Sequence, residues 1–118
     1  MTGEKRDTKI YLKDILESIE LIENYTKDVE EEKFYKDFQV QDSVMRRLEI
    51  IGEAVKNIPK NFRDKVPEIS WREIAGMRDI LTHEYFGINL RRIWKVIKND
   101  LPILKEKIKN LKDIYEEK

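Results

Sequence analysis

Residues 71–86 read WREIAGMRDILTHEYF, and this stretch decides the fold because its apolar residues recur at helical spacing. Ser70 and Glu73 have the spacing of a capping box, in which each side chain accepts from the other residue's amide, so a helix is expected to start right after Ser70. Gly87 is a good helix stop. The core-facing stripe predicted for this helix is Ile74, Met77 and Leu81.

Helical spacing continues on both sides of this stretch, without strand-like alternation. A first helix is expected from a cap at Asp7 or Thr8 to about residue 27, and a second from about residue 40 to just before Pro59. A fourth should cover 90–99, and residues 100–102 should then kink it or begin another helix that runs to about residue 115. The expected core positions outside the quoted stretch are Tyr11, Leu12, Ile15, Leu16, Ile19, Ile22, Val44, Leu48, Ile51, Val55, Ile58, Leu101, Leu104, Ile108, Leu111 and Ile114, with Phe34, Tyr35 and Phe38 packing on from the connection.

These elements predict an all-α fold, an up-and-down helical bundle of four to five helices with short connections. A length of 118 residues is typical of one domain, so residues 1–118 are expected to form a single unit with a flexible N-terminus over 1–7.

Composition excludes several classes of function. There is no cysteine, which rules out disulfides and thiolate chemistry, and the single histidine argues against a histidine metal site within one chain. We therefore expect no metal and no cofactor. No apolar run approaches the ~20 residues of a membrane span, and the polar start lacks a signal-peptide core, so we expect no membrane contact and a cytoplasmic location.

The charges of the chain are unevenly distributed although their sum is zero. Residues 13–32 hold eight acids and two bases, whereas residues 88–112 hold eight bases and two acids. Such asymmetry permits a basic face that binds nucleic acid. A solvated lysine-rich helix is the ordinary alternative.

The quoted stretch also carries residues suited to chemistry. Arg78 lies beside the predicted core face, and Asp79 and His83 are spaced i, i+4, so the carboxylate can orient the imidazole. Arg78 and His83 are ~140° apart on an ideal helix and converge only if the arginine wraps round or the last turn distorts. Gly76 costs about 1 kcal/mol in a helix interior, which a close approach by another chain or a substrate would explain. The plain alternative is a surface ion pair for Arg78 and a partly buried polar residue for His83.

Arg78, His83 and Tyr85 form the pattern Arg-x4-His-x-Tyr, which resembles the signature of HEPN ribonucleases, particularly the HepT-like toxins. The segment SVMRRLEIIGEA at residues 43–54 is similar to the second helix of that family, and residues 71–85 are similar to its third. The Asp-Leu-Pro of residues 100–102 is similar to its last helix, so the resemblance extends over about residues 10–108.

The resemblance implies a toxin that cleaves RNA without a metal, as a homodimer whose cleft contains both copies of Arg78 and His83. It also implies a partner, an MNT-type nucleotidyltransferase antitoxin that silences the toxin by AMPylation of Tyr85. The residue types fit this activity, because histidine serves as general acid or base near neutral pH and arginine matches phosphate oxygens. Tyr85 is expected to bind the RNA substrate or to anchor the helix end. Two alternatives are a non-catalytic HEPN module that binds nucleotides or RNA, and a structural dimerising bundle.

Overall fold

The structure, a computed structural model, describes the backbone of residues 3–83 and 90–116, and the side chains of residues 8–78 and 90–111. All its regular elements are helical, which confirms the predicted all-α class. In chain order the elements are α1 (Gly3–Thr26), α2 (Glu31–Phe34), α3 (Phe38–Asn57), α4 (Lys60–Asp64), α5 (Trp71–His83), α6 (Leu90–Lys95), the π-helix η2 (Val96–Asp100) and α7 (Leu101–Glu116).

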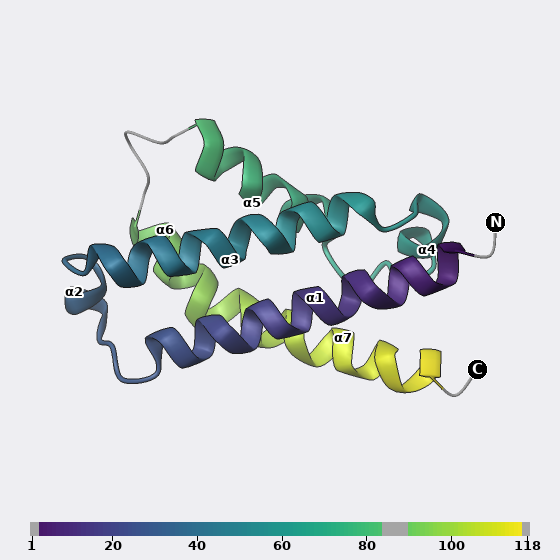
Figure 1. The fold of residues 1–118 in the computed structure, drawn as a ribbon, viewed down its shortest axis with the longest axis horizontal. Coiled ribbons are helices and arrows are strands. Elements are labelled where there is room, and N and C mark those ends of the chain that lie inside the picture. Colours follow the sequence, from purple (N-terminus) through teal and green to yellow (C-terminus); the bar gives the residue numbers. More distant parts are fainter. Residues whose placement is uncertain (1–2, 84–89, 117–118) are drawn as a thin grey trace.

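The two longest helices, α1 and α3, run antiparallel along each other and form the centre of the bundle (Figure 1). Helix α7 packs on α1, and α5 packs on α3 at the other side, so α3 separates α5 from most of the remaining bundle. Lys105 of α7 donates to Glu23 of α1 at 2.8 Å, and this hydrogen bond raises the pKa of Lys105. None of the described helices combines the length and apolarity needed to cross a bilayer.

The core contains most of the positions predicted from helical spacing. Ile15, Ile19 and Ile22 of α1 are fully buried. Tyr11, Met77 and Leu111 pack against the core but stay partly exposed, and Phe38 is 75% exposed. The side chains of Leu81 and Ile114 lie outside the described residues. The amide of Val40 donates to the Asp37 carboxylate at 3.1 Å, which starts α3 at Phe38 and leaves that ring in the first turn, outside the core.

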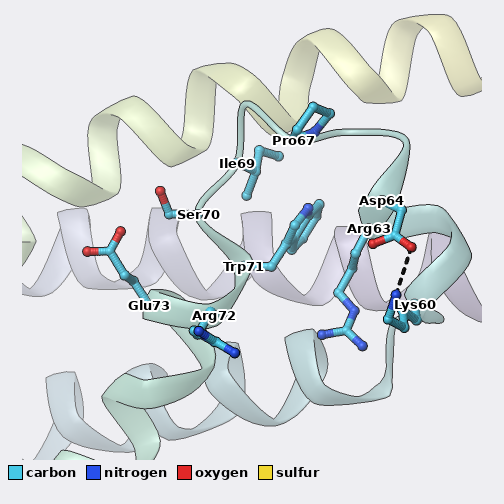
Figure 2. Close-up of a pocket in the computed structure, with 9 residues that line it drawn as sticks. All are labelled: Lys60, Arg63, Asp64, Pro67, Ile69, Ser70, Trp71, Arg72 and Glu73. Atoms are coloured by element: carbon cyan, nitrogen blue, oxygen red, sulfur yellow. Dashed lines mark hydrogen bonds and ion pairs between the residues drawn. The ribbon is translucent and has the colours of Figure 1, made fainter.

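Two predicted helix caps also differ from the structure. Helix α1 begins at Gly3, ahead of the cap expected at Asp7 or Thr8, and Thr8 is buried within it. Helix α5 begins at Trp71 as predicted, but the reciprocal side-chain bonds of a capping box are absent between Ser70 and Glu73 (Figure 2). The flexibility expected for residues 1–7 and the single-domain extent stay predictions.

Helix α7 begins at Leu101, so Pro102 lies in a first turn, which is one of the two predicted outcomes, and the turn before it is a wider π-helix. The amide of Leu101 bonds to the carbonyl of Val96, five residues back, and η2 joins α6 to α7. Proline cannot donate to the carbonyl four residues before it and its ring collides with that carbonyl, so a wider turn relieves both problems. The expected cap Asn89 lies outside the described residues.

Candidate functional site

Arg78 lies on α5 at the edge of a groove that the long helices form. The groove has a volume of about 320 Å³ and is lined by Tyr11, Asp14, Arg46, Glu49, Ile50, Glu53, Ala54, Asn57 and Arg78. These residues come from α1, α3 and α5, so the Arg78 side chain stands where three helices meet. Its side chain is 39% exposed, which agrees with the predicted place beside the core face and leaves it accessible to a ligand.

Gly52 of α3 brings α5 unusually close at the level of Arg78. A Cβ atom built on Gly52 would lie 2.9 Å from the Arg78 Cβ, and 3.6 Å from both the Arg78 amide nitrogen and the Ile74 carbonyl oxygen. Real Cβ contacts are essentially never shorter than 3.0 Å. The absence of a side chain at Gly52 therefore allows α3 and α5 to pack closely, and this packing positions the Arg78 side chain relative to α3.

Sequence reasoning missed this role of Gly52 and looked instead to Gly76. A Cβ at Gly76 would meet nothing within 4 Å in the described part of the chain, so the close approach predicted there does not come from this chain. A mid-helix glycine such as Gly52 costs about 1 kcal/mol relative to alanine, and that cost was the available signal. Which helix came close could be seen only in the packed structure.

Glu53, the residue after Gly52, forms an ion pair with the Arg78 side chain. The distance from Arg78 Nε to Glu53 Oε1 is 3.5 Å, and the Glu53 side chain is 50% exposed. An ion pair this exposed contributes at most ~1 kcal/mol, so it matters more for the direction of the guanidinium than for the stability of the fold. Glu53 thus directs the Arg78 guanidinium through a contact weak enough for a bound anion to replace.

His83 is the last residue of α5, and the backbone remains α-helical up to it. The distortion of the last turn that would bring Arg78 and His83 together is therefore absent from the described backbone. Positions 78 and 83 stay ~140° apart around the helix and ~7.5 Å apart along it. The side chains of Asp79 and His83, and the whole of Tyr85, lie outside the described residues, so their predicted roles stay predictions.

Replacing Gly52 by alanine is expected to destabilise the fold by about 1–3 kcal/mol, because the added methyl group forces α3 and α5 apart. Chemical denaturation followed by circular dichroism measures the change. Asp42→Ala, an exposed position on the same helix, is the matched control and should shift stability by less than about 0.5 kcal/mol. A Gly52→Ala protein as stable as the wild type would contradict the close approach.

The sequence is similar to known proteins of one family. The family model described as "Ribonuclease HepT-like" matches residues 15–111. The "Probable ribonuclease HepT" of Thermococcus cleftensis is 53% identical over 108 residues, which cover 92% of this chain and 98% of that protein. The "Gamma-glutamylcyclotransferase and putative RNase" of Methanocaldococcus jannaschii is 57% identical over 104 residues, or 88% of this chain, but the match spans only 47% of that protein. No solved structure matches.

Proposed function

The chain belongs to the HepT-like ribonuclease family, and from this we propose that it is an endoribonuclease toxin that cleaves RNA without a metal, using Arg78 and His83. The observation that carries the proposal is the placement of Arg78. The close packing at Gly52 positions Arg78, and Glu53 directs its guanidinium. The half-exposed Arg78 side chain lines a groove, and Arg78 precedes the single histidine of the chain by five residues.

The proposed reaction uses the 2′-hydroxyl of the RNA as the nucleophile. Its oxygen attacks the adjacent phosphorus while the bond from phosphorus to the 5′-oxygen of the next nucleotide breaks. The products are a 2′,3′-cyclic phosphate and a 5′-hydroxyl. One proton leaves the 2′-oxygen and one joins the departing oxygen, which histidine can transfer near neutral pH. Arg78 would bind the phosphoryl oxygens, where negative charge accumulates in the transition state.

One chain does not hold a complete set of groups for this reaction. The sequence contains a single histidine, and the angle between positions 78 and 83 keeps them on different faces of α5. A two-fold dimer with α5 near its axis would bring two histidines and two arginines into one cleft. The open surface at Gly76, two residues before Arg78, supports an approach of the second copy at this level.

The test of this function is cleavage of RNA in excess EDTA by purified protein. We expect single-stranded RNA to be cut at an unchanged rate when EDTA replaces Mg²⁺, because protein side chains supply every proton and the cation. The His83→Ala protein is the control for contaminating nuclease. Cleavage that stops in EDTA and returns with Mg²⁺ would refute the metal-independent mechanism.

The dimer can be tested separately from catalysis. We expect light scattering at micromolar concentration to show a homodimer, and we expect Gly76→Ala to weaken it. Within the chain a methyl group at Gly76 meets nothing within 4 Å, and alanine is the better helix former, so weakening would have to arise between chains. A monomer with full ribonuclease activity would sink the composite site.

A further inference from the structure

A second hollow lies where α4 and the loop after it meet the start of α5 (Figure 2). Its volume is about 540 Å³, and it is lined by Lys60, Arg63, Asp64, Pro67, Ile69, Ser70, Trp71, Arg72 and Glu73. The wall is firmly built, because Trp71 is 7% exposed and its Nε1 donates to the Val66 carbonyl at 3.0 Å. Phe62 packs edge-on against the same indole. None of the groups in the proposed mechanism lines this hollow.

The charged side chains that line this hollow are only partly paired with one another. Lys60 donates to Asp64 at 3.0 Å, so these two largely neutralise each other. Figure 2 shows the Glu73 carboxylate on the opposite side of α5 from the guanidinium of Arg72. In the same view the guanidinium of Arg63 lies between the guanidinium of Arg72 and the Lys60–Asp64 ion pair. Two arginines on one side of the hollow therefore form its excess positive charge.

Arg63 has an unmet requirement. Its Nε is buried and has no hydrogen-bond partner among the described residues. A buried donor without an acceptor destabilises the fold, and native structures keep few of them. Water cannot reach this atom, so an anion in the hollow would bind the terminal nitrogens of the same guanidinium, whose planar donors match its oxygens.

We propose that Arg63 and Arg72 bind a backbone phosphate of the RNA, away from the bond that is cut; this assignment rests on the proposed ribonuclease function. Arg72 precedes Arg78 by six residues, which is ~9 Å along α5. The two hollows also adjoin in the chain, because Asn57 lines the groove at Arg78 and Lys60 lines this one. Arg72 and Arg78 also stand ~120° apart around α5, so a single strand would have to curve round the helix to reach both arginines.

Contacts of this kind have a recognisable signature. A phosphate contact raises affinity for every sequence alike, and it contributes about 0.7 to the slope of log affinity against log salt for single strands. The double variant Arg63→Gln/Arg72→Gln removes two positive charges while keeping similar side-chain length. It should therefore bind RNA ~10-fold more weakly at low salt, with a slope about 0.7 units shallower. In cleavage assays KM should rise and kcat should stay within about twofold.

The experiment measures fluorescence anisotropy of a labelled 2′-O-methyl oligonucleotide, which binds but cannot be cut, over a range of salt concentrations. The control is Lys36→Gln/Lys109→Gln, which removes equal charge from exposed positions outside both hollows. Thermal melting checks the fold, and the single variant Arg72→Gln, at an exposed position, serves if the double variant does not fold.

Equal affinity and equal salt slope in the double variant and its control would overturn the proposal. Inorganic phosphate that binds the wild type but not the double variant, without any loss of RNA affinity, would overturn the RNA assignment, as would a loss of antitoxin binding alone. The proposed function fails on different results. If the protein binds RNA through these arginines but does not cut it, the phosphate site stands and the proposed nuclease function fails. If the protein cuts RNA and the double variant binds RNA as well as the wild type does, the nuclease function stands and the phosphate site fails.

Discussion

Replacing His83 or Arg78 by alanine is expected to lower the rate of RNA cleavage by ~10²-fold or more while leaving the fold intact, because each loses a group that acts in the transition state. Alanine keeps the Cβ of Arg78, so the contact with Gly52 that sets the distance between α3 and α5 is preserved. The substitution removes the guanidinium and its exposed ion pair with Glu53. Helical content and melting temperature should therefore match the wild type.

Glu53→Gln is the graded comparison for those two variants. Glutamine keeps the length of the side chain but loses the charge that directs Arg78, so cleavage should fall by less than tenfold, in line with ~1 kcal/mol for an exposed pair. Glu49→Gln is its control, because Glu49 lines the same groove but faces Arg46, at 3.7 Å. A His83→Ala protein that cuts RNA at the wild-type rate would refute the catalytic assignment.

AMPylation of Tyr85 is expected to abolish cleavage without unfolding the protein. In this proposal the antitoxin transfers AMP from ATP to the tyrosine oxygen: the new oxygen–phosphorus bond replaces the bond between the α- and β-phosphates, pyrophosphate leaves, and the phenol loses its proton. The added phosphate carries a negative charge seven residues from Arg78 along the chain. It would compete with RNA for the guanidinium, and the adenosine would fill the cleft.

The measurement is incubation with an MNT-type nucleotidyltransferase, Mg²⁺ and ATP, followed by peptide mass spectrometry and a cleavage assay. Tyr85→Phe cannot accept AMP and is the control. Modification and activity are scored separately, because Tyr85→Phe loses any contact of its own with RNA. Transfer to another residue, or covalent silencing of Tyr85→Phe, would refute the switch.

Helical spacing predicted the fold well because each helix buries one stripe of its own residues. Ile51 and Val55 of α3 illustrate this, since their places follow from steps of three and four along one chain segment. The missed features depend on contacts between segments. The 2.9 Å approach at Gly52 needs α5 to be packed against α3. Phe38 is exposed because the bond from the Val40 amide to the Asp37 carboxylate starts α3 at that residue. Helix α5 starts without the predicted capping box, because the side chains of Ser70 and Glu73 lie apart.

The candidate site was predictable in part. The motif located Arg78, whereas its partner Glu53 became evident only from the packing of α5 on α3. The arginines around α4 carried no motif at all, because Arg63 and Arg72 are joined by a loop that only the fold closes. Spacing along a helix cannot predict such a pocket, which depends on how the chain returns after Pro59.

The most direct test of the central claim uses an RNA oligonucleotide with one 2′-deoxy substitution at the cleaved nucleotide. The account predicts that cleavage at that bond stops, because the nucleophile is gone, while the all-ribose oligonucleotide yields a 2′,3′-cyclic phosphate and a 5′-hydroxyl by mass spectrometry. Cleavage of the deoxy-substituted bond at the original rate, with 3′-hydroxyl and 5′-phosphate ends, would contradict it.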